Sequence, residues 1–298
     1  MSAKEKILLI GGNGFVGKSL QECYKNDYIF KVYGSNQNIL DAQNLKVAVE
    51  QFSPHHVINL ASHVASVSRD YSETKLYDIA LHGNLNIVKA LEANQFNGTY
   101  LYVSSAEVYG YSLTRAHSES VALNPQNAYA LSKAMAENLL KLKSPEVHFN
   151  IAIARPFNHI GIGQSNVSFL QQIMSNIATQ VAKKTFPVKI EMSNPSSQRS
   201  YLDVRDVGHA YTVMLNCNKK FAIYNVCSDK AFSLPSLLSS FMKKLNIEHE
   251  FLFTDEVKGD NTLLGVNTKI KQLGWNIEQD IIETLIAIHK VKLGEQSF

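Results

Sequence analysis

The chain has 298 residues, of which 45% are hydrophobic and 18% charged, and its formal net charge is +3. This length allows one large domain or two smaller ones, and the composition is that of a folded globular protein. The even charge balance argues against a nucleic-acid partner, and no stretch approaches the roughly 18 apolar residues of a membrane span. Because residues 1–6 lead directly into an expected strand, we expect no signal peptide and a cytoplasmic location.

The cysteines exclude two further classes of protein. Cys23, Cys217 and Cys227 are odd in number, and no CxxC pair occurs. A disulfide framework and a zinc cluster therefore both find poor support. We expect three ordinary thiols in a reducing compartment and no bound metal.

The first half of the chain alternates short apolar runs with helical patterns. Strands are expected at residues 6–10, 30–34, 56–60, 99–103 and 150–154. Helices are expected at residues 17–24, 44–52, 77–93 and 129–142. Continuous apolar strands that alternate with helices are typical of a parallel sheet covered on both faces. The prediction is an α/β fold with a Rossmann-type, doubly wound parallel sheet.

The second half is less regular. Helices are expected at residues 168–183, 204–216, 234–245 and 278–291. The last of these places Ile281, Leu285 and Ile288 on one face, as an amphipathic helix requires. We therefore expect a dinucleotide-binding domain over 1–155. A smaller C-terminal α/β lobe is expected over 156–298, with a return segment near 200–227 that rejoins the first domain.

A glycine loop follows the first expected strand and opens the first helix. Residues 11–17 read GGNGFVG and contain both GxGxxG and GxxGxxG. Glycines permit a tight turn and a close backbone approach to a pyrophosphate, which the free N–H groups of the helix N-terminus then bind. Gly11, Gly14, Phe15, Val16 and Gly17 are thus candidate cofactor-binding residues. The alternative is a glycine turn without a ligand.

The end of the second strand bears on the choice between NAD and NADP. An acidic side chain there would bind the ribose 2′-hydroxyl of NAD, but the chain has Ser35 followed by Asn36. No arginine stands there either, so the missing carboxylate alone favours NADP(H) over NAD(H). Asp41 lies at a distance from which it can reach the adenine, although a solvated loop aspartate is the alternative.

A YxxxK motif opens the helix expected at 129–142. Its spacing places Tyr129 and Lys133 on one helical face. A nearby ammonium lowers the pKa of a tyrosine, so this phenol is predicted to exchange a proton near neutral pH. An apolar seam on the other side of the helix is expected to pack, and it consists of Leu131, Met135, Leu139 and Leu142.

The segment before this helix also carries polar groups to a strand end. Residues 103–110 read VSSAEVYG and follow the fourth expected strand, at the edge where open parallel sheets bind ligands. Ser105 is predicted to hydrogen-bond a substrate carbonyl beside Tyr129. The alternative is a serine-rich turn.

These three motifs together resemble the extended short-chain dehydrogenase/reductase family, which includes nucleotide-sugar epimerases, dehydratases and 4-ketoreductases. Residues 155–164 (RPFNHIGIGQ) and 199–207 (RSYLDVRDV) are similar to segments of the GDP-4-keto-6-deoxymannose reductases and related nucleotide-sugar 4-ketoreductases. Residues 273–275 match the LGW typical of the family near its C-terminus. The resemblance covers nearly the whole chain.

The resemblance implies roles for individual residues. Ser105, Tyr129 and Lys133 would be the catalytic triad, with Tyr129 as proton donor to the C4 carbonyl oxygen and Lys133 on the nicotinamide ribose. Further residues would line the cofactor site, namely Leu60, Ala61, Ser62 and Pro156.

The resemblance also implies a substrate site for a nucleotide sugar. Asn158 would contact the diphosphate and Arg199 would neutralise phosphate charge, since a guanidinium pairs two phosphate oxygens; the alternative for Arg199 is a surface cation. Glu107 would orient the sugar, or act as an acid or base, or be merely structural. Lys258 is the candidate nearest to the place where these reductases often carry another arginine, which is Val257 here.

The departures from the family favour reduction. Dehydratases use an Asp-Glu pair directly after the catalytic Ser or Thr, and Ala106 stands in the place of that aspartate. The leading prediction is NAD(P)H-dependent reduction of a nucleotide-activated 4-keto-6-deoxyhexose. The alternatives are an epimerase with tightly bound NAD and a regulator without catalysis. The helices at 77–93 and 129–142 resemble those that form a four-helix homodimer interface in the family.

Overall fold

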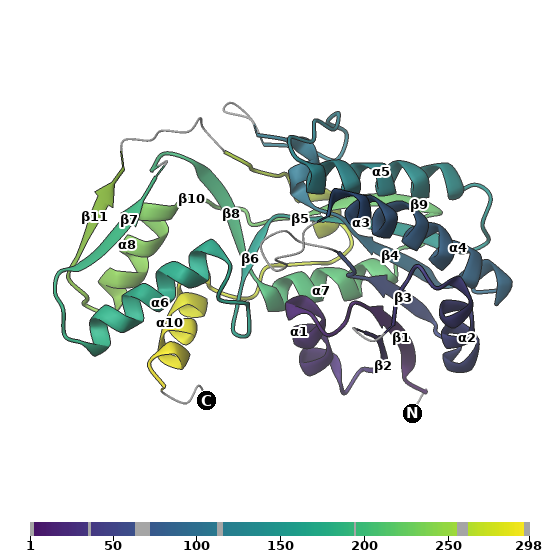
Figure 1. Cartoon of the computed structure of the whole chain (residues 1–298), viewed down its shortest axis with the longest axis horizontal. Coiled ribbons are helices and arrows are strands. Elements are labelled where there is room, and N and C mark those ends of the chain that lie inside the picture. The colour runs from purple at the N-terminus through teal and green to yellow at the C-terminus, as the bar shows by residue number, and fades with distance from the viewer. Residues whose placement is uncertain are drawn as a thin grey trace.

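The centre of the protein is a six-stranded parallel sheet (Figure 1). In this computed structural model the described residues are 3–34, 37–62, 72–111, 116–193, 195–254 and 262–294. The strand order is β2-β1-β3-β4-β5-β9. The strands are β1 (Glu5–Ile10), β2 (Tyr28–Tyr33), β3 (His56–Asn59), β4 (Thr99–Val103), β5 (Asn150–Pro156) and β9 (Phe221–Val226). The order reverses after β1, which confirms the doubly wound Rossmann-type sheet.

Helices cover both faces of this sheet. The apolar core on one face contains side chains from α2 (Ala42–Phe52), α4 (Asn84–Ala93) and α5 (Ala128–Lys143). The core on the other face contains side chains from α1 (Phe15–Tyr24) and α7 (Val204–Leu215). Buried strands such as β3, in which every residue is buried, explain why the strand sequences read as continuous apolar runs.

A smaller α/β lobe lies at the left of Figure 1 and has its own core. Its helices are α6 (Phe169–Ala182), α8 (Leu234–Lys244) and α10 (Ile281–Lys292). Its strands are β6 (Asn158–Ile160), β7 (Val188–Met192), β8 (Gln198–Asp203), β10 (Ala231–Ser233) and β11 (His249–Phe253). Leu285 and Ile288 of α10 are buried in the core and Ile281 packs against it, which confirms the predicted helix face.

The chain returns from this lobe to the first sheet. After β8, α7 packs on the sheet and β9 becomes its sixth strand, paired parallel with β5. Beyond α9 (Thr268–Lys271), Trp275 is fully buried on the same face and donates from Nε1 to Asp206 O at 3.0 Å. The domain boundary expected at residue 155 stays a prediction.

One predicted helix is interrupted. Residues 77–93 were expected to form a single helix, whereas the structure has α3 (Glu73–Asp78), a π-helical turn at Ile79–Gly83 and then α4. Gly83 lies so close to Ile39 that a Cβ on this glycine would be 2.4 Å from Ile39 Cδ1. The Asn84 side chain donates to Ala80 O at 2.7 Å across the widened turn. Such π-turns are frequent at functional sites, and here Ile79 lines the cavity described below.

The predicted seam of α5 is only partly covered within this chain, since Met135 and Leu139 are half-buried. Leu131 and Leu142 are 42% and 68% exposed. The small side chains of Ala130, Ala134 and Ala136 are buried instead, because they let the helix approach the sheet closely. The expectation that the seam packs was therefore wrong for Leu131 and Leu142 within the isolated chain.

The described residues contain neither a membrane-spanning helix nor a metal-binding cluster. No helix among them is long and apolar enough to cross a membrane. Within the same ranges, no three His, Cys, Asp or Glu side chains are grouped so that they could hold a metal ion. Cys217 and Cys227 are buried thiols and Cys23 is an exposed one.

Candidate active site

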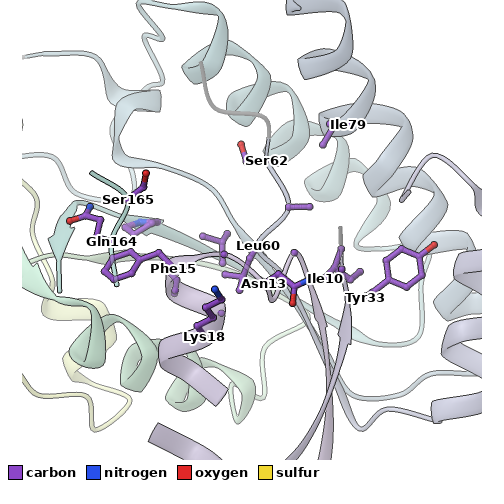
Figure 2. A pocket seen from close by; sticks show the side chains of 18 of the residues that line it. Ile10, Asn13, Phe15, Lys18, Tyr33, Leu60, Ser62, Ile79, Gln164 and Ser165 are labelled. Atoms are coloured by element: carbon purple, nitrogen blue, oxygen red, sulfur yellow. The ribbon is translucent and has the colours of Figure 1, made fainter. Parts of the chain in front are cut away.

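A cavity of about 1050 Å³ opens along the C-terminal edge of the six-stranded sheet. This volume is at the upper end of the roughly 300–1,000 Å³ typical of small-molecule sites. The structure brings eleven of the predicted cofactor residues together in its lining: Gly11, Gly14, Phe15, Val16, Gly17, Leu60, Ala61, Ser62, Tyr129, Lys133 and Pro156. Figure 2 shows Phe15 beside Gln164 and Ser165, with Tyr33 toward the opposite end.

The glycine loop has the close approaches that its sequence predicts. Gly11 has φ +76°, and a Cβ on it would lie 2.9 Å from Ala61 N. A Cβ on Gly17 would lie 2.4 Å from Gly12 O, so α1 can pack against the loop only without a side chain there. Gly14 caps α1 without a side-chain hydrogen bond, which leaves the first N–H groups of the helix for a ligand. This cradle fits the pyrophosphate of a dinucleotide.

The charged groups of the cavity also fit an anionic ligand. Lys18 and Lys133 line it, and the lining residues that the structure describes include no Asp or Glu. Gly34, Gln37 and Asn38 line the end next to β2. The predicted cofactor residue Ser35 and its neighbour Asn36 lie outside the described residues.

Asp41 caps a helix in this structure, and its contact with the adenine stays a prediction. Its carboxylate accepts a hydrogen bond from Asn44 N at 3.0 Å and so caps α2. It does not belong to the described lining of the cavity. An aspartate is among the preferred N-cap residues, and this function explains its position without a ligand.

Tyr129 lies in the first turn of α5 and is partly buried. The Asn127 side chain caps the helix by accepting from Ala130 N at 2.8 Å, which fixes this turn. The hydroxyls of Ser105 and Ser62 lie near the Tyr129 phenol and act to lower its pKa. Burial, and then the charge of Glu107, raise the pKa of Tyr129 to about 12.

The raised pKa of Tyr129 corrects the prediction that a neighbouring ammonium lowers it. Burial penalises the phenolate more than the surroundings stabilise it. The phenol is therefore protonated at neutral pH, as a proton donor must be. Ser105 lies close to Tyr129, and its contact with a substrate carbonyl stays a prediction.

Lys133 lies one turn further along α5 and is 4% exposed. Its Nζ donates to Val103 O at 2.8 Å and lies 4.9 Å from the centre of the Tyr102 ring and 5.8 Å from that of Tyr129. Burial lowers the pKa of Lys133 to about 8, while the charge of Glu137 acts in the opposite direction. The amino group thus sits beside the phenol, at the point where β4 ends.

Those predicted substrate residues that the structure describes do not belong to the described lining of this cavity; they are Ser105, Glu107, Asn158 and Arg199. Glu107 accepts from Asn127 Nδ2 at 2.9 Å, which ties it to the cap of α5. Asn158 is exposed on β6. On β8, which pairs with β6, the Arg199 guanidinium lies 5.2 Å from the ring centre of Tyr111. Lys258 and its neighbour Val257 fall outside the described residues.

Several lining residues were not identified from the sequence. Lys18 directly follows Gly17, so its place on the first turn of α1 was a signal that went unused. His159 stacks on Phe15 with ring centres 6.1 Å apart, and burial lowers its pKa. Tyr211 of α7 and Gln164 reach the cavity through tertiary packing, for which the local sequence gives no signal.

The fold and the cavity together define a Rossmann-type dinucleotide-binding protein with a tyrosine–lysine pair at the end of its sheet. Comparison with known sequences agrees with this class. Residues 7–227 match the NAD dependent epimerase/dehydratase family, and the chain belongs to this family.

Two individual relatives are named as reductases. The chain is 31% identical over 304 residues to a GDP-6-deoxy-D-mannose reductase of Pseudomonas aeruginosa, covering 95% of this chain and 96% of the relative. It is 25% identical to a dTDP-4-dehydro-6-deoxyglucose reductase of Escherichia coli, over 95% and 97% of the two chains.

Two solved structures superpose on nearly the whole chain. The structure of RMD from Pseudomonas aeruginosa, complexed with NADPH, superposes with a TM-score of 0.84 at 27% identity, over 98% and 99% of the two chains. A UDP-glucose 4-epimerase of Thermotoga maritima has a TM-score of 0.82 at 17% identity, over 97% and 98%, which shows a common fold.

Proposed function

We propose that this protein uses NAD(P)H to reduce the C4 keto group of a nucleotide-activated 4-keto-6-deoxyhexose. The observation that carries the proposal is the placement of Tyr129 and Lys133 in the lining of a dinucleotide-sized cavity, with Ser105 close to Tyr129. The names of the relatives from Pseudomonas aeruginosa and Escherichia coli support this substrate class. Ala106, buried where the dehydratases have an aspartate, argues against loss of water from the sugar.

The side chains of this protein would supply the proton and the alignment. A bound reduced nicotinamide would supply the hydride to C4, so that the electron pair of the C=O bond would pass to the oxygen. Tyr129 then donates its phenolic proton to that oxygen, because its raised pKa keeps the phenol protonated. Ser105 orients the phenol, and Lys133 adds positive charge beside the developing charges.

Preference for NADP(H) over NAD(H) is part of the proposal. Three features support it: the absence of a carboxylate among the described lining residues, the amino group of Lys18 and the NADPH in the Pseudomonas aeruginosa structure. A carboxylate at the end of β2 would repel the 2′-phosphate of NADP, whereas an ammonium attracts it.

The test is oxidation of NADPH followed at 340 nm. GDP- and dTDP-4-keto-6-deoxyhexoses are supplied in parallel, each with NADPH or NADH, and Tyr129→Phe is the matched control because it removes only the hydroxyl. We expect stoichiometric oxidation with one nucleotide sugar and a loss of about 100-fold or more in the variant. Interconversion of sugars without net oxidation, detected by NMR, would refute the reductase and assign an epimerase.

We also propose a homodimer formed through α3, α4 and α5. The exposed side chains of Leu131 and Leu142 on α5 support it, since water-exposed leucines on one face favour burial against a partner. α5 runs beside α3 and α4, so a second copy would complete a four-helix contact. Light scattering after size-exclusion chromatography tests this, and we expect Leu142→Glu to shift the mass from dimer to monomer.

A further inference from the structure

A buried ion pair lies directly behind Lys133. Glu137 follows Lys133 by one turn of α5, and Arg155 faces it from β5; each side chain is 3% exposed. Arg155 Nε donates to Glu137 Oε1 at 3.0 Å and to Oε2 at 3.2 Å, and Nη2 donates to Oε2 at 2.5 Å. Removing one partner of such a pair leaves an uncompensated buried charge, so the pair acts as a unit.

This pair is joined to Lys133 through the end of β4. Ser104 Oγ donates to Glu137 Oε1 at 2.5 Å. The preceding carbonyl, Val103 O, accepts the hydrogen bond from Lys133 Nζ at 2.8 Å. Lys133, residues 103–104 at the end of β4 and Glu137 thus form a ring, which the turn of α5 between Lys133 and Glu137 closes. Arg155 fixes this ring to the neighbouring strand.

The network continues away from the cavity. Arg155 Nη1 donates to the Tyr109 hydroxyl at 2.7 Å, and this hydroxyl donates to Asn225 Oδ1 at 2.7 Å. Asn225 Nδ2 donates in turn to His117 O at 2.9 Å. Tyr109 belongs to the VSSAEVYG segment, and it does not belong to the described lining of the cavity. Its role is thus to hold Arg155 rather than to touch a ligand.

The charges around Lys133 give the pair a second effect. Glu137 lies on the same helix, Tyr129 and Tyr102 face the amino group, and the charge of Glu107 acts on Tyr129. Tyr211, from α7, also interacts with Tyr129. Burial disfavours the ammonium form of Lys133, and Glu137 opposes this effect. Arg155 balances Glu137, so removing either member changes the field at Lys133 with opposite sign.

We propose that Glu137 and Arg155 are positioning residues which together set the place and the charge of Lys133. This inference rests on the proposed function only in so far as Lys133 contacts the bound dinucleotide. It assigns a function to two buried charged groups that neither hold a proton for the reaction nor line the cavity. The neutral hydroxyl of Tyr109 then serves to keep Arg155 in register.

The test uses two variants whose effects have opposite signs. NADPH dissociation constants are measured by fluorescence from pH 6 to pH 10 for the wild type, Glu137→Gln and Arg155→Met. The basic limb of the binding curve is the high-pH range in which NADPH affinity falls. We expect this limb to move to lower pH by about one unit in Glu137→Gln and to higher pH in Arg155→Met. The matched control is Glu146→Gln, which removes an exposed ion pair with Lys143 just after α5 and should move nothing.

The outcomes separate this inference from the proposed function. Limbs that stay in place, or that move in the same direction in both variants, would overturn the positioning role even if the enzyme reduces its substrate. Opposed limbs in a protein that reduces no keto sugar would leave the positioning role intact and refute the reductase.

A double variant covers the case in which a single change prevents folding. Replacement of both members of a buried ion pair by neutral groups is often tolerated. Glu137→Gln/Arg155→Met should therefore give a native circular dichroism spectrum, with NADPH binding about tenfold weaker because Lys133 loses its alignment. Wild-type affinity in the folded double variant would contradict the inference.

Discussion

Replacement of Gly17 by alanine tests the packing argument for the glycine loop. The added Cβ would lie 2.4 Å from Gly12 O, 2.6 Å from Gly12 Cα and 2.7 Å from Gly12 C. All three are backbone atoms, so the loop itself must move. Overpacking of this kind costs about 1–3 kcal/mol, whereas the helix propensity of alanine returns at most about 1 kcal/mol.

We therefore expect Gly17→Ala to lower the free energy of unfolding by about 1–2 kcal/mol and the Tm by roughly 2–6 °C. NADPH binding should weaken as well, because Gly12 belongs to the displaced loop. Scanning calorimetry with and without NADPH measures both effects.

The matched control lies on the facing helix. Gly208 of α7 is also helical, but a Cβ there would be 3.6 Å from Leu20 Cγ, an ordinary contact. Gly208→Ala should stabilise the protein by up to about 1 kcal/mol. A Gly17→Ala protein as stable as the wild type, alongside a stabilised Gly208→Ala, would refute the argument from backbone contact.

Three further predictions concern the cavity. Lys18→Met should raise the NADPH dissociation constant about threefold to tenfold, and more at low than at high salt, because salt screens an exposed charge. Lys46→Met replaces an exposed lysine on α2 and should leave the dissociation constant unchanged. Equal effects of the two variants in fluorescence titrations would contradict the role of Lys18. Tyr211→Phe should leave the ligand-free protein as stable or more stable in urea unfolding, since this buried hydroxyl has no hydrogen-bond partner among the described residues; a clear destabilisation would show that the hydroxyl is satisfied. The free energy of unfolding of Lys133→Met should fall relative to that of the wild type as the pH rises from about 8 to 10.5. Burial lowers the pKa of Lys133, so in this range the unfolded wild-type chain binds more protons than the folded one. Wild-type stability therefore rises with pH. A difference in free energy of unfolding between the two proteins that stays constant across this range would count against the burial argument.

The cofactor half of the site was readable from the sequence because its determinants are local. Gly11 to Gly17 need a particular backbone path, and Tyr129 and Lys133 need only the four-residue spacing of a helix. The capping role of Asp41 was not identified because helix capping and ligand binding draw on the same residue types, and the hydrogen bond from Asn44 N became visible only in the structure.

The electrostatics of the site were not readable in this way. The sequence shows a tyrosine four residues before a lysine, and this spacing alone predicts a lowered pKa. The structure adds the burial of Tyr129 and the charge of Glu107, whose effects prevail and raise the pKa to about 12. A desolvation penalty depends on all the chain segments that surround a group, which a spacing rule does not contain.

The sequence by itself thus determined the doubly wound sheet, the glycine loop and the identity of the tyrosine–lysine pair. These features depend on periodicity and on backbone conformations that few residue types permit. The tertiary structure decided which side of α5 faces the sheet, where Tyr211 and His159 lie, and that Glu137 and Arg155 meet behind Lys133. Arg155 and Glu137 are 18 residues apart and on different elements. Only the packing of α5 across the ends of β4 and β5 brings these charges together, and burial there makes their pairing obligatory.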